Sequence, residues 1–122
     1  MIGPLLAALL LNQPAAAPAT GWLEFDRREV GFGESAFLYN RWSVRGDGGA
    51  PSAWITYDFH YSGRNPTTHV ELWQVDCERR RNRIVRGFLL DQIGDSTIRR
   101  GGRYRAIEPG SAEAALAGRL CR

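Results

Sequence analysis

The chain has only two cysteines, Cys77 and Cys121, and a bond between them would constrain its fold more than any other feature. Cys77 ends a run with strand-like alternation, and Cys121 ends a short helical pattern close to the C-terminus. Joining them would close a loop of about 45 residues, worth about 4 kcal/mol of stability by chain-entropy arithmetic. Two buried free thiols are the alternative. The disulfide would fix a C-terminal helix to a small β-sheet.

The N-terminus has the order of a signal peptide. An almost continuous apolar run over residues 4–11 is followed by two polar residues and a small-residue tract that ends in Ala17-Pro18-Ala19. The run is roughly half of the about 20 apolar residues that a spanning helix needs, and the prolines that follow disfavour a packed helix. We predict a signal peptide over residues 1–19 and a mature domain over residues 20–122, exported to the periplasm or the outer surface. Export favours the disulfide over free thiols, because it brings the chain into an oxidising compartment.

Composition is that of a folded domain. Hydrophobic residues make up 43% of the chain and charged residues 24%, which excludes the low-hydrophobicity composition of disordered chains. All 16 basic residues are arginine, and 13 acidic residues reduce the net charge to +3. Nine of the arginines lie between Arg79 and Arg105, where no interleaved series of aromatic side chains is suited to stacking bases. We therefore expect no nucleic-acid partner.

Short apolar and aromatic runs, separated by turn residues, predict an antiparallel sheet after Gly21. The expected strands are Trp22–Phe25, Ala36–Val44, Ala53–Tyr61, Thr67–Cys77, Arg83–Leu90 and Thr97–Ile107. The expected turns are Gly46–Ser52, Ser62–Pro66 and Gly101–Gly102. Alternation places Ile55 and Tyr57 on the opposite face from Trp54, and Glu71 and Trp73 on the opposite face from Leu72.

The last residues change from strand-like to helical periodicity. Pro109 and Gly110 end the final strand, and Ser111 is a suitable N-cap for a helix of about ten residues. The apolar stripe of this helix consists of Leu116, Ala117, Leu120 and Cys121. A helix this short must dock to be stable. The predicted fold class is α+β: one twisted antiparallel sheet of about five or six strands, with a C-terminal helix docked on it by the disulfide.

Two segments carry a resemblance to a known family. Residues 75–84, Val-Asp-Cys-Glu-Arg-Arg-Arg-Asn-Arg-Ile, and residues 107–113, Ile-Glu-Pro-Gly-Ser-Ala-Glu, together with Cys121, resemble the surface-adhesin protein E family of bacterial exported proteins. Trp42-Ser43-Val44 and Trp54 are more loosely similar to earlier positions of that family. The resemblance implies a twisted antiparallel sheet with a helix held across it by the Cys77–Cys121 disulfide. It also implies adhesion, since the family is named for a protein that binds host extracellular-matrix and serum proteins.

Both histidines lie two residues from a carboxylate on the same strand face, His60 near Asp58 and His69 near Glu71. A hairpin across residues 62–66 would bring the two pairs near each other and offer a four-ligand metal site. The alternative is two solvent-facing imidazoles beside acidic neighbours. No helical or loop motif with metal-ligand spacing supports the site, so we predict no metal.

The arginine cluster is the sharpest chemical feature. We expect Arg79, Arg81 and Arg83 on one strand face, with Arg103 and Arg105 on a neighbouring strand. These five are the candidate ligand-binding residues, able to hold a carboxylate, a sulfated glycan or a phosphate through bidentate contacts. The alternative is a solvated face of salt bridges with the nearby acidic residues, which are Glu71, Asp76, Glu78, Asp91 and Asp95.

No catalytic motif accompanies these residues. A nucleophile elbow, a phosphate loop and, with both cysteines bonded, a thiol nucleophile are all missing from the sequence. The leading hypothesis is an exported, non-enzymatic, adhesin-like binding protein without catalytic residues or cofactor, whose partner is a protein or envelope component, such as a host matrix protein. The alternatives are a structural or inhibitory partner of an envelope protein, and a metal-dependent enzyme around His60 and His69. Unpaired edge strands add the hypothesis of a homodimer.

Overall fold

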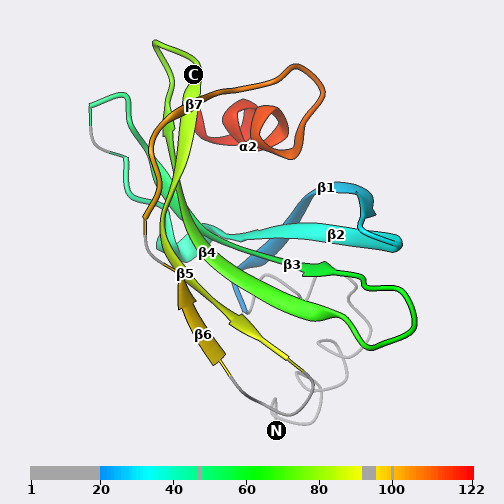
Figure 1. The fold of residues 1–122 in the computed structure, drawn as a ribbon. Coiled ribbons are helices and arrows are strands. Elements are labelled where there is room, and N and C mark those ends of the chain that lie inside the picture. Colours follow the sequence, from blue (N-terminus) through cyan, green and yellow to red (C-terminus); the bar gives the residue numbers. More distant parts are fainter. Residues whose placement is uncertain (1–19, 47, 92–95, 100) are drawn as a thin grey trace, which may run out of the picture.

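The computed structural model describes residues 20–46, 48–91, 96–99 and 101–122. The predicted signal peptide over residues 1–19 lies outside the described residues. Six strands follow one another across the sheet in chain order, and each neighbouring pair is antiparallel: β1 (Trp22–Val30), β2 (Gly33–Asn40), β3 (Ser52–Phe59), β4 (Thr67–Asp76), β5 (Arg81–Leu90) and β6 (Ser96–Arg99) (Figure 1).

The outer edge of β5 is shared by two short strands. β6 pairs with residues 87–90, and β7 (Arg105–Ala106) pairs with residues 81–82 at the other end of β5. Between them, among the described residues, the Gly102 N–H donates to the Ile84 carbonyl oxygen at 2.7 Å. This interruption separates the last two strands and shapes the surface described below.

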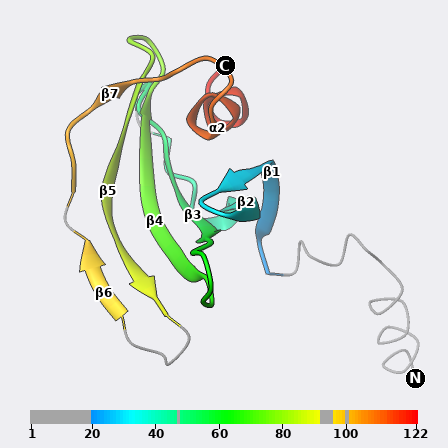
Figure 2. The same ribbon diagram turned by 45° about the vertical axis from the view of Figure 1, so that its right-hand side comes forward.

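The sheet curls, and the helix α2 (Ala112–Leu120) lies on its concave side next to β1 (Figures 1 and 2). Ser111 is its N-cap, as predicted, and the Ser111 Oγ accepts a hydrogen bond from the Ala114 N–H. At the other end, Cys121 is bonded to Cys77, with the two Cα atoms 5.7 Å apart. The predicted architecture, an antiparallel sheet with a C-terminal helix tied to it by this disulfide, is confirmed.

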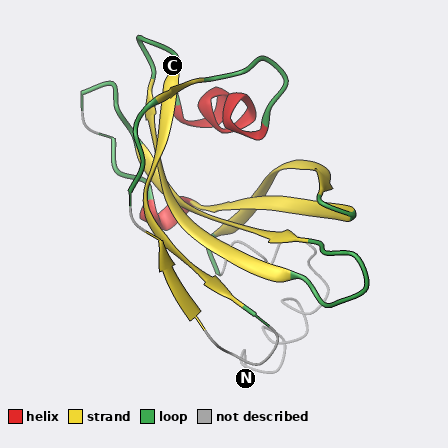
Figure 3. Cartoon of the chain, viewed as in Figure 1, coloured by secondary structure: helices red, strands yellow, loops and turns green. Residues whose placement is uncertain are grey.

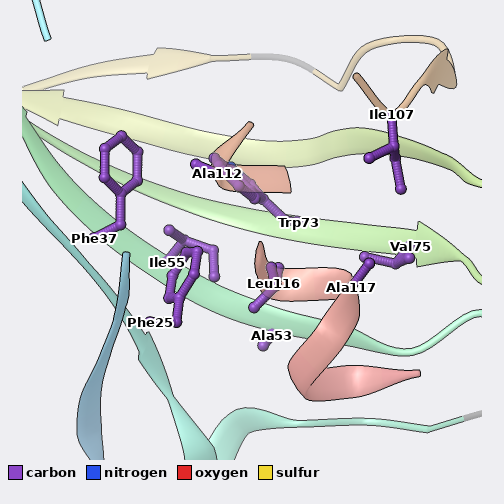
Figure 4. Packing of buried hydrophobic residues seen from close by; sticks show 10 residues of the cluster. All are labelled: Phe25, Phe37, Ala53, Ile55, Trp73, Val75, Ile107, Ala112, Leu116 and Ala117. Atoms are coloured by element: carbon purple, nitrogen blue, oxygen red, sulfur yellow. The ribbon is translucent and has the colours of Figure 1, made fainter. Parts of the chain in front are cut away.

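The core fills the space between the helix and the concave face. Figure 4 shows Leu116 and Ala117 of α2 among side chains from the central strands, and both are almost completely buried. The cluster consists of Phe25, Phe37, Ala53, Ile55, Trp73, Val75, Ile107, Ala112, Leu116 and Ala117. Burying one such leucine is worth about 2 kcal/mol, so the helix stripe contributes much of a small domain's stability.

Several predicted boundaries are wrong, and each error has a local cause. β1 continues to Val30 because its polar residues form an edge hairpin with β2, which itself begins at Gly33. β2 ends at Asn40, whose side chain accepts from the Trp42 N–H and starts the 3-10 helix η2 (Arg41–Ser43). The single strand expected over residues 97–107 is two strands (Figure 3). Within the described residues, no helix is long and apolar enough to cross a membrane.

Candidate functional site

The turn between β4 and β5 changes the predicted arrangement of the arginines. Arg79 and Arg80 lie in this turn and not on a strand, so the expectation that Arg79 shares a strand face with Arg81 and Arg83 is wrong. Arg80 has a positive φ of 54°, which lets the chain turn back into β5 at Arg81. Arg81 and Arg83 do share one face of β5, as predicted, since both contact the same ring.

Asp76 organises this turn. Its Oδ1 accepts a hydrogen bond from the Arg79 N–H at 3.1 Å, and its Oδ2 lies 3.2 Å from Arg81 Nη2 and 3.8 Å from Arg79 Nη1. The hydrogen bond from the Arg79 N–H is the largest effect on the pKa of Asp76 and lowers it. Burial, the next largest, raises it, and the Arg81 and Arg79 guanidinium groups lower it further, so the pKa lies below its ordinary value of 3.8. Arg79 and Arg81 therefore stabilise the hairpin by ion pairs with Asp76. For these two arginines, the alternative of salt bridges with nearby acidic residues is correct.

Tyr104 ties the two separated arginine segments together. The guanidinium carbons of Arg81 and Arg83 each lie 5.0 Å from the centroid of its ring, a distance suited to cation–π attraction. Arg83 is further held by its Nε–H, which donates to Gln74 Oε1 at 3.0 Å. Sequence reasoning missed Tyr104, because nothing in the local pattern shows that the segment after Gly101–Gly102 folds back over β5.

A cleft of about 630 Å³ opens beside β5 where the edge strand is interrupted. Three of the five predicted residues, Arg83, Arg103 and Arg105, line it. The complete lining is Asn82, Arg83, Ile84, Gly102, Arg103, Tyr104, Arg105, Ala106, Glu108 and Glu113, which brings β5, the segment leading into β7 and the first turn of α2 together. Among the described residues, these three arginines form no ion pair within 4 Å, although Glu108 and Glu113 line the same cleft.

Asn82 is the buried polar residue of this cleft. It lies on β5 opposite Val75, on the face that carries the core, and only 8% of its surface is exposed. Within the described part of the chain, its side-chain amide has no hydrogen-bond partner. Among the described residues, the one fully buried side-chain polar atom without a hydrogen-bond partner is Arg81 Nε, so the Asn82 amide contacts solvent and can donate to or accept from a ligand.

A second polar cluster is fully enclosed on the concave face of β4. Glu71 has no exposed surface, and its Oε1 accepts a hydrogen bond from Trp73 Nε1 at 2.8 Å. His69 Nδ1 lies 3.2 Å from Glu71 Oε2, and the Tyr57 hydroxyl donates to the carboxylate at 3.3 Å. The expectation that Glu71 joins a solvated salt-bridge ladder with the arginines is therefore wrong, because Glu71 faces the core.

The four-ligand metal cluster does not form. Tyr57 pairs with His69 across β3 and β4, so Asp58 lies on the other face of the sheet from His69 and Glu71. Asp58 instead accepts a hydrogen bond from the Thr68 hydroxyl at 2.7 Å. The alternative of two solvent-facing imidazoles is also wrong for His69, which is 8% exposed and stacks on Tyr57. No group of three or more metal-ligating side chains occurs in the residues described.

Of the predicted site residues, Arg83, Arg103 and Arg105 line the cleft, although the Arg83 side chain lies with Arg81 against Tyr104, on the other face of β5 from Arg105. Arg79 belongs to the turn and does not line the cleft. No family model, no curated protein and no solved structure matches the chain. The cleft beside β5 is the candidate functional site.

Proposed function

We propose that the chain is an exported binding protein that holds an acidic group of a macromolecule in the cleft beside β5. The observation that carries this proposal is that Arg83, Arg103 and Arg105 line one cleft and form no ion pair among the described residues, with Arg105 opposite Asn82 on one face of β5 and Arg83 on the other face. Guanidinium groups bind carboxylate, sulfate and phosphate through paired, directional hydrogen bonds. Arginines that line one cleft favour a ligand that supplies such acceptors.

A non-enzymatic role fits the other polar groups. The side chains with acid–base character on the concave face, His69 and Glu71, are buried against Trp73 and Tyr57. A catalytic pair must reach a substrate, and these two contact each other and the core. The adhesin-like character of the protein remains a proposal, based on the resemblance of residues 75–84 and 107–113 to the surface-adhesin protein E family.

The test compares two triple variants of equal net charge. One carries Arg83→Gln, Arg103→Gln and Arg105→Gln in the cleft, and the control carries Arg27→Gln, Arg64→Gln and Arg119→Gln elsewhere on the surface. Each protein is immobilised and exposed to a bacterial envelope fraction and to purified host matrix proteins. The cleft variant should lose retention of its partner by at least about tenfold, since hydrogen bonds to charged groups are worth about 1.5–3 kcal/mol each.

The control variant should retain the partner as the wild-type protein does. Equal retention by both variants would contradict the proposed site. The identity of the retained partner separates the remaining hypotheses, because capture of a matrix protein supports adhesion, whereas capture only from the envelope supports a structural or inhibitory role there.

A further inference from the structure

The face of the sheet that is turned away from α2, which we call the convex face, carries apolar side chains where a solvated sheet is usually polar (Figures 1 and 2). Leu72 on β4 lies between Glu71 and Trp73, which face the core, so strand alternation places it on the convex face. The strand pairing brings five further apolar residues to the same face. All six are only half-buried, and they are Trp22, Leu38, Trp54, Val70, Leu72 and Phe88.

A hollow of about 290 Å³ opens on this face. Its lining consists of Trp22, Asn40, Trp54, Val70 and Phe88. Asn40 is the one residue of this lining that is neither aromatic nor aliphatic, and its Oδ1 already accepts a hydrogen bond from the Trp42 N–H. An apolar cavity of about 150 Å³ can hold benzene, so the hollow has room for one large apolar side chain.

Arginines without an ion-pair partner lie beside the hollow. Arg86 is opposite Leu72 in the β4–β5 pairing, and its guanidinium carbon lies 5.7 Å from the centroid of the Trp54 ring. Arg83 is opposite Gln74 on the same face. Within the part of the chain that the structure describes, neither arginine forms an ion pair. The convex face therefore attracts carboxylates.

An apolar centre with arginines at its rim is the usual anatomy of a protein–protein interface, where Trp, Tyr and Arg carry most of the binding energy. A second copy of this chain fits less well, because the carboxylates of β3 and β4 on this face are engaged. Asp58 accepts from the Thr68 hydroxyl, and Asp76 is paired with Arg81. A nucleic acid would contact the arginines with its phosphates but would leave the aliphatic part of the face unmatched.

We propose that the convex face docks an acidic amphipathic helix of a partner protein. A large apolar side chain of this helix enters the hollow, and carboxylates on its flank pair with Arg83 and Arg86. The partner thus covers this face of the sheet as α2 covers the other (Figure 2). This surface is separate from the cleft of the proposed function, apart from Arg83, which belongs to both.

The probe is a helical peptide of about 20 residues with leucine and one phenylalanine on one face and glutamate on both flanks. It is titrated into the full, oxidised protein and followed by calorimetry and by the NMR signals of the indole N–H groups. The signals of Trp22 and Trp54 should shift, whereas that of Trp73, which is buried on the opposite face, should not. Peptides with lysine in place of glutamate, or with alanine in place of phenylalanine, should bind at least about tenfold more weakly.

Phe88→Ala should weaken binding of the glutamate peptide about tenfold, and Arg86→Gln about fivefold. The matched controls are Phe32→Ala and Arg119→Gln, which should leave binding unchanged. Phe32 is 77% exposed in the β1–β2 turn, and Arg119 lies on α2. Because Arg86 is exposed, its variant tests the face even if Phe88→Ala disturbs the fold.

The proposal fails if the glutamate peptide does not bind, if the lysine peptide binds equally well, or if Arg86→Gln has no effect. It also fails if light scattering finds a dimer that Phe88→Ala dissociates, or if only a single-stranded oligothymidylate shifts the Trp22 and Trp54 signals. Arg105→Gln changes the cleft alone and should leave peptide binding intact, so the convex face and the proposed function can fail separately.

Discussion

The Glu71 carboxylate is enclosed by the side chains of Tyr57, His69 and Trp73 on the concave face of β4. Its partner across the sheet is Gly87, and a Cβ there would lie 2.9 Å from the Glu71 Cγ and 2.6 Å from the Val70 carbonyl oxygen. The missing side chain at Gly87 therefore provides the space that the buried glutamate fills. This one position shows how a polar group can be a structural part of a small core.

Replacing Glu71 by leucine should destabilise the protein although leucine is apolar and of similar size. The variant leaves the buried Trp73 Nε1–H without the Glu71 acceptor, at about 1–3 kcal/mol, and removes the hydrogen bond from the part-buried Tyr57 hydroxyl to this carboxylate. Glu71→Gln, which keeps one acceptor oxygen, should be less affected. Urea unfolding of the three proteins measures the difference, and a leucine variant as stable as the wild type would show that these hydrogen bonds contribute nothing net.

Asp76 should make the β4–β5 turn sensitive to acid. Because its pKa is lowered in the folded state, mainly by the Arg79 N–H, ionised Asp76 stabilises the fold at pH values above its unfolded pKa. This contribution disappears as the pH falls through the lower folded pKa. Asp76→Asn should therefore be less stable than the wild type at about pH 7, and the two should converge at about pH 2.

Chemical unfolding at both pH values tests this expectation. The comparison variant is Asp58→Asn on β3, because the Asp58 carboxylate accepts its hydrogen bond from the neutral Thr68 hydroxyl. A stability gap between the wild type and Asp76→Asn that stays constant with pH would contradict the proposed role of ionisation.

Single residues also show how far sequence reasoning reached. Alternation correctly placed Glu71 and Trp73 on one face of a strand, but it cannot tell which face is covered by a helix, so the burial of Glu71 was not predicted. Asn82 and Tyr104 were missed for a related reason. Their roles depend on a chain segment more than 15 residues away folding over β5, and no local pattern encodes that contact.

At the scale of elements, α2 is a nine-residue helix that cannot persist alone and is held at both ends. Its entry is fixed by Ser111 and by Arg28 of β1, whose Nη2 donates to the Gly110 carbonyl oxygen at 2.6 Å. Its exit is fixed by the bond from Cys121 to Cys77. Between these points, Leu116 lies fully buried against the sheet.

Removing the disulfide should cost about 4 kcal/mol, because the bond spans 44 residues of sequence. The double variant Cys77→Ala/Cys121→Ala should unfold at a correspondingly lower urea concentration, and the wild type in reductant should approach the same midpoint. Mass spectrometry of the unreduced protein provides the control, since it should find no free thiol. A midpoint unchanged in the double variant would show that docking of α2 does not depend on the bond.

The predicted boundaries were most accurate where a regular apolar periodicity, of the strand or the helix type, runs over eight or more residues. β3, β4 and α2 start and end within a residue or two of expectation, because their apolar periodicity reflects burial directly. The errors lie at the sheet edges. β1 is polar over most of its length. Between β6 and β7, the missing side chain of Gly101 permits a close approach to the Val85 carbonyl oxygen of β5 that the pattern alone does not show.

At the scale of the whole molecule, stability should be graded from the centre of the sheet to the cleft. β4 is paired with β3 and β5 along nearly its whole length, whereas β7 is a two-residue strand on an exposed segment. In hydrogen exchange at neutral pH, the amides of β4 should therefore exchange most slowly, and those of Arg105 and Ala106 should exchange through local opening. Equal protection of β4 and β7 would argue against an independently opening cleft wall.

The disulfide has a topological consequence for the cleft. Every residue that lines it, from Asn82 to Glu113, lies between Cys77 and Cys121 along the chain. The binding surface is therefore carried on a single covalent macrocycle, closed by the S–S bond. One proteolytic cut inside this ring would open it without releasing a fragment, whereas reduction and a cut between Arg83 and Arg103 would place Arg83 on one fragment and the other two arginines on another.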